Sequence, residues 1–109
     1  MEKEFVPYEL AVKLKELGFD EPCLAYYNKE VNFNLCWKSN SVEPYNHNDT
    51  NKYDSLSAPT FSQAINFLYI CSNKQIDIEL KASDTYEERL RKVDKGCEDL
   101  WNLQNSKPN

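Results

Sequence analysis

The chain has 109 residues, of which 40% are hydrophobic and 13% aromatic, and it contains only 2 glycines. This composition is typical of a globular protein and excludes a disordered or fibrous one. Its 18 acidic and 13 basic residues give a net charge of -5, which disfavours generic DNA or RNA binding because phosphate neutralisation needs a basic surface.

A first amphipathic helix is predicted from Pro7 to Leu17. Proline fits the first turn of a helix, and apolar residues then recur at helical spacing at positions 10, 11, 14 and 17. Gly18 suits the left-handed position that ends a helix, and Phe19 follows where a Schellman motif packs an apolar side chain against Leu14.

A β-hairpin is predicted next, formed by residues 23–27 and 31–37. With Tyr27 placed opposite Val31, the alternation of side chains assigns Cys23 and Cys36 to opposite faces, which argues against a bridge between them. The cysteines show no C-x-x-C spacing, so we expect four buried free thiols rather than disulfides or a metal site: Cys23, Cys36, Cys71 and Cys97.

The second half of the chain begins with a long polar loop over residues 39–57. A helix is predicted from Thr60 to about Cys71, followed by a strand from Gln75 to Lys81 with one face exposed to solvent. A last helix is predicted to start after a cap at residues 83–85. The predicted order is therefore α-β-β-long loop-α-β-α. It indicates an α+β fold with a mixed or antiparallel sheet of about three strands packed by helices.

We expect a single domain over residues 1–104, followed by a polar tail over residues 105–109. The second helix is apolar on both sides, because Phe67, Tyr69 and Ile70 lie opposite its inner stripe. These three residues are predicted to form an interface, and we expect a homo-oligomer.

No membrane association is expected, because no apolar stretch approaches the roughly 18 residues that span a bilayer. The first ten residues also lack the pattern of a signal peptide, so we expect a cytoplasmic protein.

Catalytic chemistry has little support in the sequence, and no cofactor, catalytic residue or metal ligand is assigned. His47 is the only histidine, and the plainest interpretation is a solvated side chain in the polar loop. A small hydrolase that uses His47, oriented by Asp49 or Asp54, is kept as an alternative.

A nucleotide site can be built from rings in the loop and cations in the last helix, since aromatic rings stack on bases and arginine binds phosphate. The candidate ligand-binding residues are Tyr45, His47, Tyr53, Arg89, Arg91 and Lys92. The competing interpretation is that residues 89–95 form a solvated face whose charge is offset by Glu87, Glu88 and Asp94.

Three segments resemble a group of small proteins from phages and prophages of Bacteroides-type bacteria. They are FVPYELAVKLKELGFDEPCLAYY at residues 5–27, APTFSQA at 58–64 and TYEE at 85–88. The second helix departs from the group at Ile65 to Cys71, where charged residues are usual, and the segment around 75–81 is shorter. The resemblance implies a phage setting in the cytoplasm of a bacterial host.

The leading hypothesis is a non-enzymatic phage accessory protein that counters host defence by sequestering a cyclic or linear nucleotide signal. The runner-up is a protein-interaction module that inhibits a host protein by direct binding, through the acidic surface or the apolar side of the second helix.

Overall fold

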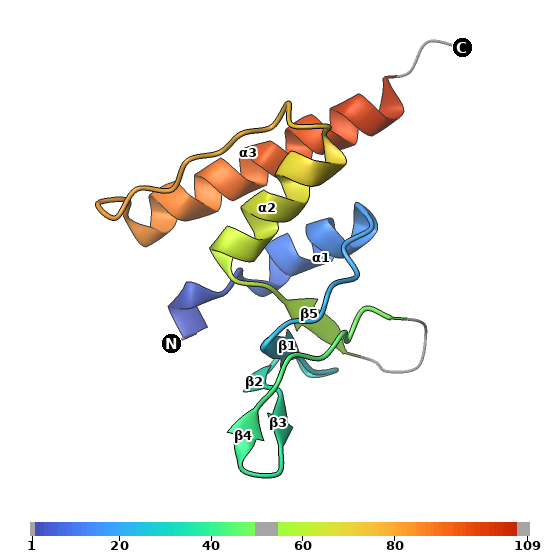
Figure 1. Cartoon of the computed structure of the whole chain (residues 1–109), viewed down its shortest axis with the longest axis vertical. Helices are drawn as coiled ribbons and strands as arrows, with labels where there is room; N and C mark the ends of the chain where they lie inside the picture. The colour runs from blue at the N-terminus through green and yellow to red at the C-terminus, as the bar shows by residue number, and fades with distance from the viewer. Residues whose placement is uncertain (1, 50–54, 107–109) are drawn as a thin grey trace. The chain divides into compact units, whose positions relative to one another are not determined.

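The computed structural model describes residues 2–49 and 55–106 of the chain. These residues divide into two compact units, unit 1 from Met1 to Thr60 and unit 2 from Phe61 to Asn109. The fold class is α+β, as predicted, with an antiparallel three-stranded sheet in unit 1 (Figure 1). The expectation of a single domain over residues 1–104 stays a prediction.

Unit 1 starts with a short 3-10 helix, η1 (Glu2–Glu4), and the helix α1 (Tyr8–Glu16), which confirms the first predicted helix. The Schellman motif is also present. Gly18 has a φ of +101° and donates its N–H to the carbonyl of Lys15 at 3.0 Å, and Phe19 donates to the carbonyl of Leu14 at 2.9 Å. Only glycine adopts such a φ without strain, so the glycine itself ends the helix here.

The hairpin consists of β1 (Ala25–Tyr27) and β2 (Phe33–Leu35), with Tyr27 opposite Phe33. The predicted pairing of Tyr27 with Val31 is therefore wrong. Val31 has a φ of +66° and belongs to the turn, where Asn28 Oδ1 accepts hydrogen bonds from the N–H groups of Glu30 and Asn32. The register differs by two residues, which leaves every paired side chain on its predicted face.

The third strand is β5 (Leu56–Ala58), which pairs antiparallel with β1 and gives the strand order β2-β1-β5. The prediction of a strand over Gln75–Lys81 is wrong, because that segment pairs with no strand in the described part of the chain. The sequence Leu56-Ser57-Ala58 alternates apolar and polar residues, but all three are buried, and the first two lie in the region predicted as a loop.

A second, two-stranded hairpin begins at the end of the predicted first hairpin and continues into the region predicted as an irregular loop. It is formed by β3 (Trp37–Lys38) and β4 (Ser41–Val42), with Trp37 opposite Val42. Ser39 takes a φ of +59° between the strands. A two-residue strand gives almost no periodicity, which is why the sequence pattern did not reveal it.

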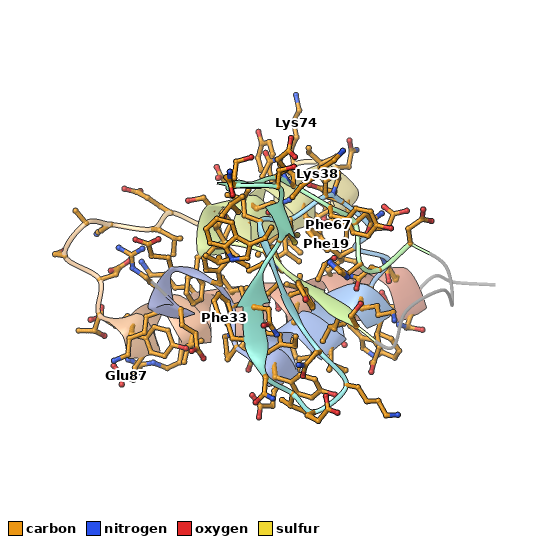
Figure 2. All side chains as sticks on the ribbon, turned by 90° about the horizontal axis from the view of Figure 1, so that it is seen from below. Phe19, Phe33, Lys38, Phe67, Lys74 and Glu87 are labelled. Carbon is orange, nitrogen blue, oxygen red and sulfur yellow. The ribbon has the colours of Figure 1, made fainter. Side chains whose placement is uncertain are left out.

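Unit 2 contains α2 (Phe61–Cys71) and α3 (Tyr86–Asn105), which pack against each other. Thr85 and Glu88 form a capping box at the start of α3, as expected for a last helix capped near residue 85. The predicted tail starts later than position 105, because Asn105 is still helical, and residues 107–109 lie outside the described residues. Lys74 and Glu87 extend from unit 2 into solvent (Figure 2).

All four cysteines are free thiols, as predicted. Cys23, Cys36 and Cys97 are buried, but Cys71 is exposed, so its predicted burial is wrong. Cys71 is the last residue of α2 and lies one turn beyond Phe67 and Leu68, the last buried residues of the helix. None of the described helices has the length and apolar character needed to cross a membrane.

Candidate ligand-binding cleft

A cleft with a volume of about 450 Å³ opens on unit 1 beside the β3-β4 hairpin. That volume is within the range of small-molecule sites. Aromatic rings and two opposite charges supply most of its lining, which consists of Tyr26, Cys36, Trp37, Lys38, Glu43, Pro44, Tyr45 and His47.

The wall that carries Tyr45 is fixed by backbone hydrogen bonds. Cys23 and Tyr45 form an isolated antiparallel bridge, with N···O distances of 3.0 and 2.9 Å. Cys36 holds the opposite wall, because its N–H donates to Leu24 at 2.8 Å and its carbonyl accepts from Glu43 at 2.8 Å. Both walls therefore depend on the segment that leads into β1.

The polar residues after Tyr45 attach this wall to the rest of unit 1. Asn48 Nδ2 donates to the carbonyl of Phe19 at 2.9 Å, and Asn48 Oδ1 accepts from the N–H of Ser57 at 2.9 Å. Asn46 Nδ2 donates to the carbonyl of Asp20. Asn46 and Asn48, whose polar side chains contributed to the prediction of a loop, therefore fix this segment to the rest of unit 1 by hydrogen bonds.

His47 is packed between rings and is not the solvated side chain that the sequence suggested. Its ring stacks on Tyr26 with a centroid separation of 4.0 Å and lies 4.9 Å from Tyr45 in a T-shaped arrangement. Its Nδ1 is 2.7 Å from Ser55 Oγ. Burial lowers the pKa of His47 below its ordinary value of 6.5, which favours the neutral imidazole at neutral pH.

The lowered pKa of His47 has a defined consequence for stability. Because the pKa of His47 is lower in the folded state, the unfolded state binds more protons as the pH falls below 6.5. The contribution of His47 to the free energy of unfolding is therefore complete above pH 6.5 and is lost as the pH falls below it. We expect the thermal midpoint to fall more between pH 7.5 and 5.5 in the wild type than in His47→Gln. Equal slopes in the two proteins would contradict this assignment.

The structure adds six cleft residues that the sequence did not nominate: Tyr26, Cys36, Trp37, Lys38, Glu43 and Pro44. Trp37 is 65% exposed, and Lys38 and Glu43 are exposed as well. The predicted hairpin extended to Trp37. The strand instead ends at Leu35, and a new hairpin starts at Trp37.

Cys36 lines the cleft without the properties of a nucleophile. Its Sγ donates to the carbonyl of Cys23 at 3.3 Å. Burial raises the pKa of the Cys36 thiol, and a hydrogen bond with the backbone of Tyr45 only partly offsets this effect. The thiol is therefore neutral, whereas a nucleophilic cysteine must be a thiolate.

The predicted ligand-binding residues fall into separate groups. Tyr45 and His47 lie together in the cleft of unit 1, and Tyr53 lies outside the described residues. The three cations belong to α3 in unit 2. The hydrolase alternative also stays a prediction, since Asp54 is outside the described residues.

Structural contacts already engage two of the α3 cations. Lys92 Nζ lies 2.7 Å from Asp84 Oδ2 and donates to the carbonyl of Glu79 at 2.8 Å. The hydrogen bond from Lys92 lowers the pKa of Asp84. Arg89 Nη2 donates to the carbonyl of Lys81 at 3.5 Å, while Arg91 is exposed.

The predicted interface residues differ in exposure. Ile70 is 64% exposed and Tyr69 is half-buried, but Phe67 is only 5% exposed and offers a partner little surface. Ile70 and Tyr69 therefore remain the candidates for an interface on α2, and the expected homo-oligomer stays a prediction.

Within residues 2–49 and 55–106, no group of three or more histidine, cysteine, aspartate or glutamate side chains is arranged to hold a metal ion. Comparisons of the chain with protein-family models, with curated proteins and with solved structures found no match.

Proposed function

We propose that this protein binds a small ligand with a planar aromatic ring, most concretely a linear or cyclic nucleotide, in the cleft of unit 1. The observation that carries the proposal is the exposure of Trp37, 65% of which is open to solvent at the edge of a ring-lined cleft. A large aromatic side chain left in water beside a cavity is typical of a surface that a ligand covers.

The chemistry of the cleft fits a base better than a purely apolar ligand. Trp37 and Tyr45 present ring faces on which a base can stack, and stacking is worth about 1–3 kcal/mol per base. Glu43 supplies a carboxylate that can accept hydrogen bonds from the amino groups of a base, and Lys38 supplies a cation for phosphate.

A non-enzymatic role follows from the same residues. The thiol of Cys36 is neutral, and the lining combines stacking rings with a single pair of opposite charges. Taken with the resemblance to phage proteins, this favours an accessory protein that counters host defence by removing a nucleotide signal from solution. Sequestration needs affinity and no turnover, so a binding cleft is sufficient.

Tryptophan fluorescence tests the proposal directly, because the chain has 2 tryptophans and only Trp37 lines the cleft. In a Trp101→Phe background, Trp37 is the only reporter, and a stacked base should quench its emission. The ligands to screen are mononucleotides and cyclic mono- and dinucleotides. A ligand at 100 times its Kd adds about 2.7 kcal/mol of stability, so a thermal-shift screen provides an independent measurement.

Trp37→Ala is expected to weaken the binding of the best ligand by about 10- to 100-fold, as the loss of one stacked base predicts. The matched control is Trp101→Ala, which removes the other exposed tryptophan and should leave affinity unchanged. If no nucleotide produces either quenching or a thermal shift, the proposal is overturned. Equal losses in both alanine variants would move the binding site away from the cleft.

A further inference from the structure

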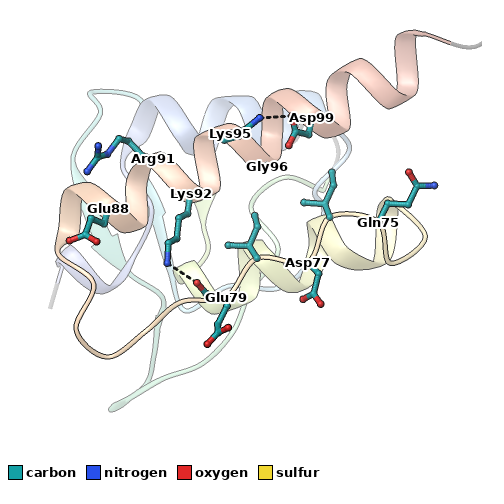
Figure 3. A pocket seen from close by; sticks show the side chains of 11 residues that line it. Gln75, Asp77, Glu79, Glu88, Arg91, Lys92, Lys95, Gly96 and Asp99 are labelled. Carbon is teal, nitrogen blue, oxygen red and sulfur yellow. Dashed lines mark hydrogen bonds and ion pairs between the residues drawn. The ribbon is translucent and has the colours of Figure 1, made fainter.

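The extended segment between α2 and α3 has an unusual backbone. The segment runs along α3 outside any helix (Figure 3), and residues 77–80 have no strand partner among residues 2–49 and 55–106. Within the described residues, the N–H groups of Asp77, Ile78, Glu79 and Leu80 donate no hydrogen bond to the protein. An extended backbone with unpaired N–H groups is a template for the addition of another strand. The carbonyl of Glu79 already accepts a hydrogen bond from Lys92, so the added strand must use the other backbone groups of the segment.

The segment is nevertheless held in place at both ends. Ile76 donates its N–H to Ser72 Oγ at 2.8 Å, and Lys81 donates its N–H to Asp84 Oδ2 at 2.8 Å. Ile76 itself is 8% exposed. A partner strand would therefore meet a backbone that is already ordered, which reduces the entropy lost on binding.

Gly96 allows the segment to pack closely on α3. A Cβ at position 96 would lie 2.6 Å from Ile78 Cδ1 and 2.8 Å from Leu68 Cδ1. Beside this contact, a groove of about 620 Å³ follows residues 75–79 and the face of α3 that carries Arg91, Lys92 and Lys95. Figure 3 shows this groove, with Lys92 reaching across it to the carbonyl of Glu79.

Charge indicates what the added strand must carry. Asp77 and Glu79 are exposed, lie two residues apart and point away from α3 (Figure 3). In contrast, Lys92 and Lys95 of the groove already pair with Asp84 and Asp99. Side chains on one face of a strand repeat every second residue, so a partner with basic residues at alternate positions matches this acidic pair.

A second copy of the segment fits less well. An antiparallel pair centred on Ile78 would place Asp77 opposite Glu79 in both halves, and like charges directly opposite each other are destabilising. A register shifted by two residues would place Glu79 opposite itself. The segment therefore disfavours pairing with itself and favours a partner of opposite charge.

We propose that residues 77–80 dock an extended peptide of a partner protein by strand addition, and that this peptide carries lysine or arginine at alternate positions. The docking edge belongs to unit 2, so it is independent of the nucleotide proposed for the cleft of unit 1.

The probe is a capped nine-residue peptide of alternating lysine and valine, and its control has glutamate in place of lysine. Isothermal titration calorimetry should show at least tenfold tighter binding of the lysine peptide. Asp77→Lys with Glu79→Lys should reverse this order. The matched control is Glu2→Lys with Glu4→Lys, which makes the same change in net charge at exposed positions of η1 and should preserve the order.

Two proline variants test the backbone itself, since successive N–H groups of a strand point to opposite edges. Ile78→Pro and Glu79→Pro each remove an N–H that donates no hydrogen bond within the described residues. Ile78→Ala keeps the N–H but loses the contact with Gly96, so it controls for lost packing. Only one of the two proline variants should lose peptide binding, by at least tenfold, and Ile78→Ala should keep it.

Strand addition is overturned by equal binding of the two peptides or by equal effects of the two proline variants. It is also overturned if the Glu2→Lys with Glu4→Lys control reverses the preference between the peptides as the Asp77→Lys with Glu79→Lys variant does. Self-association through this segment would also overturn it. If either proline variant fails to fold, the paired charge substitutions at exposed positions still decide the question.

Discussion

Replacing Phe19 with alanine is expected to lower the free energy of unfolding by about 3–5 kcal/mol, the largest effect of any single substitution considered for unit 1. Phe19 is 1% exposed, and its backbone closes the Schellman motif with Leu14. Its carbonyl also accepts the hydrogen bond from Asn48 that attaches the cleft wall. The cavity would therefore form where the end of α1 and the cleft wall meet.

Chemical denaturation of Phe19→Ala measures this loss, and Phe19→Leu is the matched control. Leucine keeps most of the apolar volume, so the control should lose less than half as much stability. Trp37→Ala removes a larger ring from an exposed site and should change stability by less than about 1 kcal/mol. A loss below 1 kcal/mol in Phe19→Ala would contradict the assignment of Phe19 to the core.

The second large effect is expected at Leu68 of α2. Leu68 is fully buried, and its Cδ1 lies in the close contact that Gly96 of α3 permits. Leu68→Ala should cost about 2–5 kcal/mol, since the transfer energy and the cavity left against α3 both contribute. Denaturation monitored by circular dichroism will report this loss, because α2 and α3 supply most of the helical residues.

Ile70→Ala is the matched control for Leu68→Ala. Ile70 lies two positions further along the same helix but is 64% exposed, so its truncation should change the free energy of unfolding by less than about 0.5 kcal/mol. A substantial loss in Ile70→Ala would instead show that this side chain is covered in solution. Such a loss would revive the predicted interface on α2, and light scattering would then show an oligomer.

The two binding proposals, for the cleft and for the docking edge, can be contradicted independently of each other. The cleft of unit 1 is tested by Trp37→Ala, and the docking edge of unit 2 by Asp77→Lys with Glu79→Lys. Nucleotide binding should survive the charge substitutions, and peptide binding should survive Trp37→Ala. A protein that bound the peptide and ignored every nucleotide would act as an interaction module, which was the runner-up hypothesis from the sequence.

The sequence predicted helices and their ends well. The stop signal of Gly18 and Phe19 occurs in the structure as hydrogen bonds, and Thr85, one of the three residues predicted as possible caps of the last helix, caps α3. These features join residues at most a few positions apart, so the residues that decide them are adjacent in the sequence. The buried stripe of α1 follows from the same short-range geometry, whereas Phe67 of α2, which was predicted to lie opposite the inner stripe, is buried.

Strand pairing and the cleft were decided only by tertiary structure. Residues 75–81 have the alternation of a strand but no strand partner in the described part of the chain, whereas Leu56–Ala58, which is too short to show a clear pattern, forms the third strand of the sheet. A strand exists only through hydrogen bonds to a distant segment, and alternation does not identify that segment.

The same reason explains why the sequence nominated only Tyr45 and His47 of the cleft residues. It marked them as rings in a polar loop, but the stack of His47 on Tyr26 and the exposure of Trp37 depend on contacts across unit 1. By itself, the sequence determined the helices, their caps and the α+β class. The third strand, the cleft and the open edge at residues 77–80 came from tertiary structure, because each depends on which distant segments meet.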